Sequence, residues 1–224
     1  MLVCNVTMES FAFQDFEKAC ESGKIKGADG TQQIQPASFE PRLRDHAYVI
    51  ESQMNALFRP QAREKVAKML DFSYKVSLNG GYELKRGFTY LIPLQEEVRL
   101  EDHEYMKSSP KSSLGRLFLN TRLIADFNLG FDEIHPHENE HLQLYLIVQP
   151  LQFNVIVYPD SFLNQIRIFK GVESQVSTQT LIETQKHDPF LLIREDNELK
   201  PAELRISDNV YLHLDLQGFG SNNI

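Results

Sequence analysis

Apolar positions near the N-terminus recur at the spacing of an amphipathic helix. In FAFQDFEKACESGK (11–24), Phe13 and Phe16 fall on one face together with the small residues that follow them. A second helix is predicted in QAREKVAKMLDF (61–72), which directly follows a proline. A third is predicted within VESQVSTQTLIETQKHDPF (172–190). Helices therefore account for only a small part of the chain.

Most of the remaining apolar residues lie in short segments that are rich in β-branched and aromatic residues and are typical of strands. Turn signals at Asn79-Gly80-Gly81 and Pro159-Asp160 separate some of these segments and suit hairpins. Many short strands with few helices favour an antiparallel sandwich or barrel. The predicted strands are HAYVIE (46–51), YKVSL (74–78), YELKRGFTYLIPL (82–94), RLFLNTRLIA (116–125), LQLYLIVQ (142–149), FNVIVY (153–158) and LNQIRIF (163–169).

The pattern changes after residue 171, which predicts a boundary between two parts of the chain. Residues 1–171 hold the strand-rich domain. Residues 172–224 are predicted to form a linker helix and the first strand of an incomplete second domain, with strand-like pieces at 191–201 and 209–220.

Composition narrows the classes of function. The chain has 224 residues and a net charge of −8, and this acidic balance argues against nucleic-acid binding. No apolar run approaches the length of about 18–20 residues that a membrane helix needs, and no signal peptide is evident, so we expect no membrane partner and a cytoplasmic location. Only Cys4 and Cys20 are present, which excludes a disulfide framework.

A cationic, hydroxyl-rich stretch, PKSSLGRL (110–117), stands out in this acidic chain. Lys111, Ser112, Ser113 and Arg116 offer donors for phosphate oxygens, and an arginine can bind them with two parallel hydrogen bonds. We expect this stretch at the entrance of a strand. Taken alone, it favours a solvated loop over a phosphate site, and it is not a Walker loop.

A second polar stretch, HPHENEH (135–141), contains histidines and glutamates, which are common zinc ligands. Its position between two predicted strands favours a solvated loop over a metal site. Zinc-dependent deamination requires a P-C-x-x-C motif, which the sequence lacks. A serine-hydrolase G-x-S-x-G elbow is also absent.

Taken together, four stretches in order resemble dCTP deaminases, most closely the N-terminal half of the two-domain bacterial form. The resemblance implies a mostly β, dUTPase-like distorted antiparallel β-barrel with a few short helices. It also implies a trimer, or a pseudo-trimer with a second homologous domain. The stretches are IQPASFEPRL (34–43), GFTYLIPLQEEVRL (87–100), PKSSLGRLFLNTRLIADFNLGFDEI (110–134) and DSFLNQIRIFKG (160–171).

The resemblance implies a function and a set of site residues. The function is hydrolytic deamination of dCTP to dUTP, in which a glutamate activates water, Mg²⁺ accompanies the triphosphate and no zinc takes part. Lys111 would face the phosphates, and Arg116 would help to position the water and the base. Ser112 and Ser113 match a serine pair, one near the base and one on the phosphates. Ala125 would meet the pyrimidine through its backbone, and Gln165 matches the glutamine of the last motif.

The sequence departs from the family where the general base is expected. LYLI (144–147) places Ile147 at the position of the glutamate, and isoleucine cannot accept a proton. Either a second domain supplies the base, or the chain is a non-catalytic nucleotide-binding or scaffold subunit. A third alternative is a dUTP diphosphatase, for which Asp126 or Asp132 would activate the water. In the first stretch, Glu40 replaces the usual aspartate.

Overall fold

The computed structural model describes residues 8–50, 66, 74–128, 130–171, 177–195 and 198–202. The chain divides into two compact units, Met1–Val172 and Glu173–Ile224. The predicted helix at 61–72 lies outside the described residues except for Val66, and the predicted strand at 209–220 lies outside them entirely. Among the described residues, no helix is long and apolar enough to cross a membrane.

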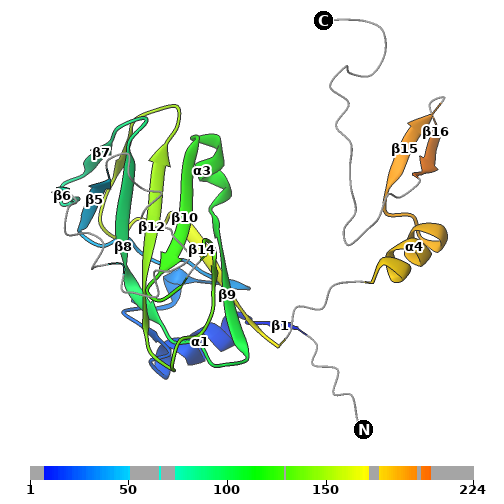
Figure 1. Cartoon of the computed structure of the whole chain (residues 1–224), viewed down its shortest axis with the longest axis horizontal. Coiled ribbons are helices and arrows are strands. Elements are labelled where there is room, and N and C mark those ends of the chain that lie inside the picture. The colour runs from blue at the N-terminus through cyan, green and yellow to red at the C-terminus, as the bar shows by residue number, and fades with distance from the viewer. Residues whose placement is uncertain are drawn as a thin grey trace, which may run out of the picture. The chain divides into compact units, whose positions relative to one another are not determined.

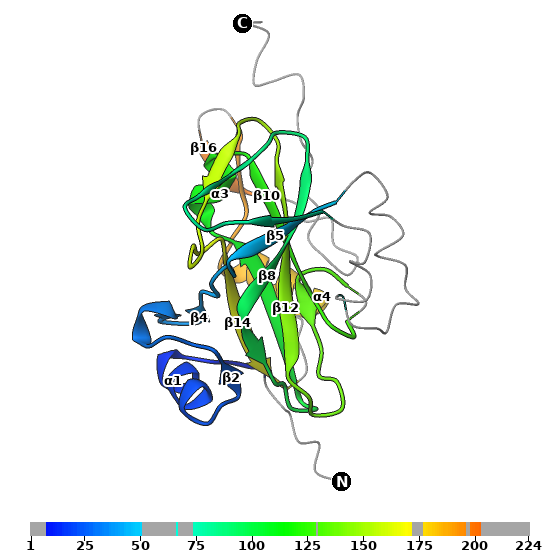
Figure 2. The same cartoon turned by 90° about the vertical axis from the view of Figure 1, so that its left-hand side faces the viewer.

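In its described part, the first unit is built on two antiparallel sheets, which confirms the mostly β fold (Figures 1 and 2). Sheet A has the order β11-β9-β14-β4-β3, and β1 also pairs with β14. Its strands are β1 (Glu9–Ser10), β3 (Ile34–Gln35), β4 (Ser38–Phe39), β9 (Glu104–Pro110), β11 (Glu133–Ile134) and β14 (Asn164–Lys170).

Sheet B has the order β10-β12-β8-β5-β6, and β2 also pairs with β8. The strands β7 and β13 pair only with each other in the described part, as a separate small sheet. The strands of sheet B are β2 (Ile25–Lys26), β5 (His46–Ile50), β6 (Tyr74–Ser77), β8 (Thr89–Val98), β10 (Leu119–Ala125) and β12 (Leu142–Pro150); the small sheet contains β7 (Tyr82–Leu84) and β13 (Val155–Val157).

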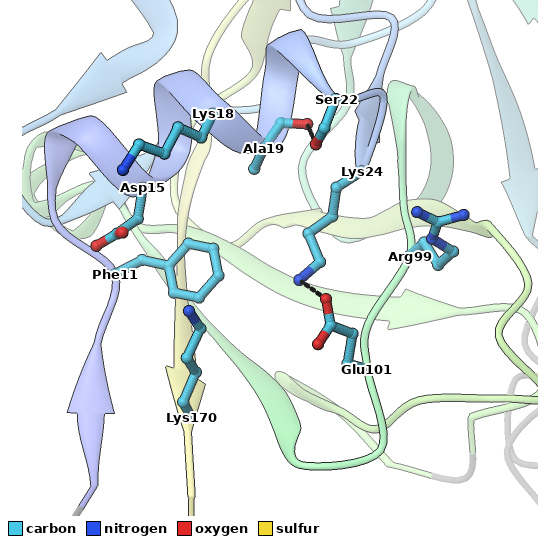
Figure 3. Close-up of a pocket in the computed structure, with 9 residues that line it drawn as sticks. All are labelled: Phe11, Asp15, Lys18, Ala19, Ser22, Lys24, Arg99, Glu101 and Lys170. Carbon is cyan, nitrogen blue, oxygen red and sulfur yellow. Dashed lines mark hydrogen bonds and ion pairs between the residues drawn. The ribbon is translucent and has the colours of Figure 1, made fainter.

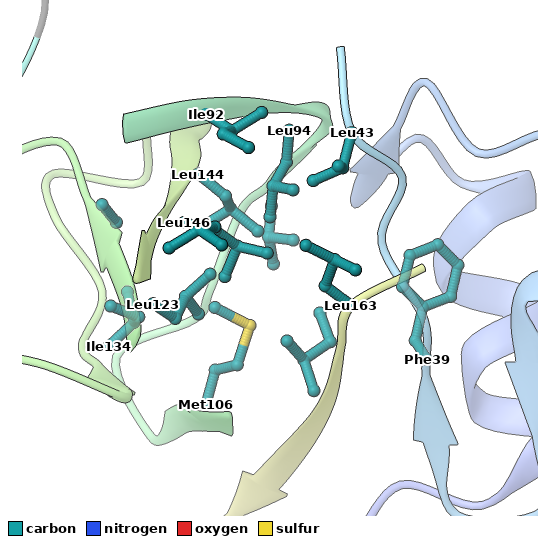
Figure 4. Packing of buried hydrophobic residues seen from close by; sticks show 14 of the residues in the cluster. Phe39, Leu43, Ile92, Leu94, Met106, Leu123, Ile134, Leu144, Leu146 and Leu163 are labelled. Atoms are coloured by element: carbon teal, nitrogen blue, oxygen red, sulfur yellow. The ribbon is translucent and has the colours of Figure 1, made fainter. Parts of the chain in front are cut away.

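The main core fills the space between sheets A and B. Figure 4 shows Leu144 and Leu146 of β12 meeting Met106 of β9 and Leu163, which precedes β14. These side chains are buried and come from strands far apart in sequence, so burial of their apolar surface holds the two sheets together.

Strand β12 is buried on both of its faces. Side chains alternate along a strand, so Leu144 and Leu146 face the main core while Tyr145 and Ile147 face the other side. Tyr145 and Ile147 join a second apolar cluster with Leu91, Ile124, Ile50 and Val66. The outer face of sheet B is therefore covered in this region rather than open.

The helix predictions at both ends of the described chain are confirmed. Helix α1 (Phe13–Glu21) buries Phe16 and Ala19, and the Asp15 carboxylate accepts a hydrogen bond from the Ala12 N–H at its start. In the second unit, α4 (Thr178–His187) begins at Ser177, whose hydroxyl accepts from the Thr180 N–H. This N-cap satisfies one of the free donors of the first turn.

The strand-like piece at 191–201 is confirmed as an antiparallel pair, β15 (Leu192–Glu195) with β16 (Glu198–Pro201). Gln185 of α4 donates to the carbonyls of Leu191 and Ala202, at 2.7 and 2.9 Å. Within the second unit, the helix and the strand pair are thus tied by hydrogen bonds.

Two turn predictions were wrong about what the turns connect. The turn at Asn79-Gly80-Gly81 is present, but β6 before it pairs with β5, whereas β7 after it pairs with β13. Similarly, Pro159-Asp160 separates β13 from β14, which belong to different sheets. Each turn passes the chain between sheets, because turn residues define a reversal and not the partner of the next strand.

The predicted strand at 82–94 is divided into β7 and β8. Between them, the Lys85 N–H donates to the Tyr90 hydroxyl at 2.8 Å, and the Arg86 N–H donates to the Asn154 side chain at 2.9 Å. Gly87 has a φ of 81°, which favours glycine. Side chains thus satisfy the backbone donors that a continuous strand would give to a neighbour.

Candidate functional site

The stretch PKSSLGR forms a short helix, α3 (Ser112–Arg116), between β9 and β10 (Figure 1). The prediction of a strand from residue 116 was therefore wrong at its start, since β10 begins at Leu119. Leu114 is buried and anchors α3 to the core. Ser112, Ser113 and Arg116 are exposed, and among the described residues their side chains form no hydrogen bond or ion pair.

Lys111, by contrast, is already engaged. Its ammonium group lies 2.6 Å from a carboxylate oxygen of Glu40 and 5.7 Å from the centre of the Phe162 ring. Its backbone N–H donates to the Leu163 carbonyl at 3.0 Å. Lys111 thus fixes the start of α3 against two other segments, and its charge is partly neutralised before any ligand binds.

The stretches that carry the family resemblance meet around this point. Arg42, two residues after Glu40, donates to the buried carboxylate of Glu96 in β8 through its backbone N–H and its Nε, at 2.8 and 2.9 Å. Arg42 also forms an isolated β-bridge with Phe162. Glu40, Glu96, Lys111 and Phe162 come from the four separate stretches, so one set of contacts joins all of them.

Gln165, a predicted ligand, lies in β14 beside β9. Its side-chain amide donates to the Ser109 hydroxyl at 3.2 Å. Its neighbour Asn164 is fully buried and bridges strands: it donates to the Ser108 hydroxyl at 2.9 Å and accepts from the Thr121 hydroxyl. Sequence reasoning missed Asn164, although a polar residue within an apolar strand pattern was a signal for such a bridge.

Ala125 lies at the opposite end of β10 from α3. It is buried, it pairs with Leu144 of β12, and its carbonyl accepts from the Asn128 N–H at 3.4 Å. Strand β10 runs from Leu119 to Ala125, a length of about 20 Å at about 3.3 Å per residue. The residues predicted for the phosphates and for the pyrimidine therefore lie apart within one chain.

Ile147 is 3% exposed and sits in the apolar cluster on the outer face of sheet B. It pairs with Arg122, whereas Tyr145 pairs with Ile124, the neighbour of Ala125. Tyr145 is therefore the outward-facing residue of β12 beside the Ala125 end. Burial, reinforced by the negative charge of Asp126, raises the pKa of the Tyr145 hydroxyl. Sequence reasoning did not name Tyr145 as a site residue. Its hydroxyl stays un-ionised at neutral pH.

The two aspartates considered for a diphosphatase are both held by protein groups. Asp126 is buried and accepts from the Val66 N–H at 2.8 Å. Asp132 accepts from the Leu123 N–H at 2.7 Å and pairs with the Arg122 guanidinium. Burial raises the pKa of Asp132 despite these partners.

The histidines of HPHENEH make separate contacts. His135 lies 3.2 Å from the Glu133 carboxylate, and the His137 ring stacks on Phe127 with centroids 4.3 Å apart. A ring nitrogen of His141 lies 2.8 Å from the Gly23 carbonyl oxygen. The stretch connects β11 of sheet A with β12 of sheet B, and each imidazole lies against a different part of the fold.

Comparison with known families decides the relationship. The family model for the "2'-deoxycytidine 5'-triphosphate deaminase (DCD) N-terminal domain" matches residues 9–172, which is most of the chain. The chain belongs to this family. The match covers nearly all of the first unit and includes α3, β10 and β12.

A similar solved structure is the 2'-deoxycytidine 5'-triphosphate deaminase from Agrobacterium tumefaciens, with a TM-score of 0.73 and 28% sequence identity. The match covers 96% of this chain and 60% of that one, so the chain spans little more than half the length of that deaminase. No curated protein sequence matches the chain.

Proposed function

We propose that this member of the dCTP deaminase family binds dCTP, with the triphosphate at α3, and contributes half of a site for hydrolytic deamination to dUTP. One observation carries the proposal: Ser112, Ser113 and Arg116 are exposed on a short anchored helix without partners among the described residues. Their hydroxyl and guanidinium groups suit phosphate oxygens. Family membership supports the choice of dCTP.

The site is completed by another polypeptide surface. Because β10 separates α3 from Ala125 by about 20 Å, one chain does not surround both ends of a nucleotide. A second copy, in a trimer, or a homologous second domain, in a pseudo-trimer, would place its own Ala125 end beside α3. The A. tumefaciens deaminase is longer than this chain, which leaves room there for such a domain.

The proposed chemistry divides between binding and proton transfer. Attack of water on C4 of cytosine releases ammonia, and a base must first take a proton from that water. Neither Ile147 nor the un-ionised Tyr145 can do so. The chain's own residues therefore bind and orient dCTP, and the base comes from the completing surface. If no surface supplies one, the buried outer face favours the alternative of a nucleotide-binding subunit without catalysis.

Metal requirements follow from the residues at α3. Mg²⁺ prefers carboxylate and phosphate oxygens. The Glu40 carboxylate lies beside the start of α3, but it is already paired with Lys111. We therefore propose that Mg²⁺ arrives with the triphosphate. From the family resemblance we also propose that zinc takes no part and that the protein is cytoplasmic.

Calorimetric titration of the full chain with dCTP and Mg²⁺ tests the binding site. Arg116→Ala should weaken binding at least about tenfold, because a charge-assisted contact to phosphate is lost. The matched control is Arg167→Ala, which removes an exposed arginine of β14. Equal affinity of the wild type and Arg116→Ala, or no binding by the wild type, would refute a triphosphate site at α3.

The deamination half of the proposal has a separate readout. We expect the 224-residue chain alone to form dUTP very slowly or not at all, as measured by chromatography, while still binding dCTP. Rapid dUTP formation by this chain would show that it contains a general base of its own.

A further inference from the structure

A polar cavity in the first unit is lined by α1 and the segments beside it. Figures 1 and 2 show α1 away from α3 within this unit. Its volume is about 340 Å³, within the size range of small-molecule sites. Figure 3 shows side chains from α1, from the segments after α1 and β8, and from β1's end and β14 arranged around it; they are Phe11, Asp15, Lys18, Ala19, Ser22, Lys24, Arg99, Glu101 and Lys170.

One of the cations in this cavity is neutralised by the protein itself. The Lys24 ammonium group lies 3.0 Å from a Glu101 oxygen and 2.6 Å from an oxygen of the buried Glu104. It also lies 5.5 Å from the centre of the Phe11 ring. Lys24 and these carboxylates form a fixed wall of the cavity, and the hydrogen bond from Lys24 lowers the pKa of Glu101.

The other cations have no such partner. Among the described residues, Lys18, Arg99 and Lys170 form no ion pair with a carboxylate. Lys170 is the last residue of β14, and its ammonium group lies 4.9 Å from the centre of the Phe11 ring. The remaining carboxylate of the lining, Asp15, accepts from the Ala12 N–H. Four cations and two carboxylates line the cavity, so its lining is positive overall in an otherwise acidic chain, although the charge of Lys170 also acts on Glu101.

We propose that this cavity binds a small phosphate-bearing anion at a site separate from α3. Cations from α1, from the segment after β8 and from β14 line one concave volume, so a phosphate placed there is attracted by several of them (Figure 3). The Phe11 ring is buried and fills the floor. The site therefore recognises the anionic group and offers no exposed aromatic face to a nucleobase.

Pyrophosphate titrated into the full chain by calorimetry, without nucleotide and at low salt, tests the proposal. We expect measurable binding that weakens at least tenfold in the double variant Arg99→Gln/Lys170→Gln. The titrations are made in the Arg116→Ala background, so that pyrophosphate bound at the proposed triphosphate site on α3 does not contribute and the remaining binding reports on the cavity. Lys26→Gln is the matched control, because Lys26 is exposed and outside the cavity.

Lys18→Gln provides a second variant that does not disturb the core, since Lys18 is exposed on α1. We expect it to weaken pyrophosphate binding several-fold while circular dichroism and thermal unfolding stay unchanged. Absence of wild-type binding at millimolar pyrophosphate would overturn the proposal. Loss of binding in Arg116→Ala with unchanged affinity in both cavity variants would also overturn it, and would assign the anion to α3 instead.

Discussion

Helix α3 and the outer face of β12 present different chemistry to what surrounds them. On α3, Ser112 and Arg116 are exposed and have no partner among the described residues. On β12, Tyr145 and Ile147 are buried in an apolar cluster that includes Val66 from a distant part of the sequence. The first region is ready to contact an anion, whereas the second is already occupied by the chain's own side chains.

This difference separates two requirements of a deaminase. Binding a triphosphate needs donors that are held in place but unpaired, and α3 meets that need because Leu114 and Lys111 anchor it. Activating water needs a base in a site that water can enter, and the apolar cluster on β12 provides neither. A chain can therefore keep the first property while the second is lost or supplied by another surface.

The largest expected effect comes from placing a carboxylate on the covered face. Ile147→Glu should lower the free energy of unfolding by about 3–5 kcal/mol at pH 7, because an unpaired charge would be buried. Burial raises the pKa of the new carboxyl, so ionisation in the unfolded state alone destabilises the fold increasingly as pH rises above about 4. Urea unfolding at pH 4.5 and pH 7 measures the difference.

Ile156→Glu is the matched control, because Ile156 in β13 is 58% exposed. This variant should unfold within about 0.5 kcal/mol of the wild type at both pH values. If Ile147→Glu were as stable as this control and also formed dUTP, the outer face of β12 would be an accessible catalytic surface, and the contrast with α3 would disappear.

How much of this contrast the sequence could predict depends on how far apart in the sequence the interacting residues are. Local patterns identified α1, α4 and most strands, since helical spacing and clusters of β-branched residues act within a few positions. The ordered stretches also identified the family. The hairpins were assigned wrongly because strand partners depend on contacts distant in sequence, as β7 with β13 shows.

The same limit applies to the site. The sequence shows that Lys111 is basic but not that Glu40, far away along the chain, lies 2.6 Å from it. By contrast, the predicted strand at 116–125 already placed Arg116 and Ala125 at opposite ends of one strand. The sequence also does not show which face of sheet B Ile147 lies on, since an isoleucine in a strand suits either a core face or a covered outer face.

A comparison of two neighbouring cations sharpens the description of α3. Arg116→Gln should weaken dCTP binding at least about tenfold, or about 1.4 kcal/mol. Lys111→Gln should weaken it no more than about threefold, because the Glu40 carboxylate already compensates the lysine charge. Calorimetry with Mg²⁺ and dCTP on both variants gives the ratio.

Glu40→Gln serves as the converse control. It releases the Lys111 ammonium group from its ion pair, so dCTP should bind about two- to threefold more tightly. Weaker binding in Lys111→Gln than in Arg116→Gln would mean that Lys111 leaves Glu40 to contact the triphosphate.

The last effect arises only at alkaline pH and concerns the hydroxyl on the covered face. Burial and the charge of Asp126 raise the pKa of Tyr145 above that of an unfolded tyrosine. Above about pH 10 the unfolded chain loses this proton while the folded chain keeps it, so the fold loses up to about 1.4 kcal/mol per pH unit from this group. Tyr145→Phe should therefore lose less stability than the wild type between pH 9 and pH 11 in urea unfolding. Tyr74→Phe, at a tyrosine that is 74% exposed, is the control and should follow the wild type. Identical alkaline slopes for Tyr145→Phe and the wild type would show that water reaches this hydroxyl, and the outer face of β12 would then be open to a substrate.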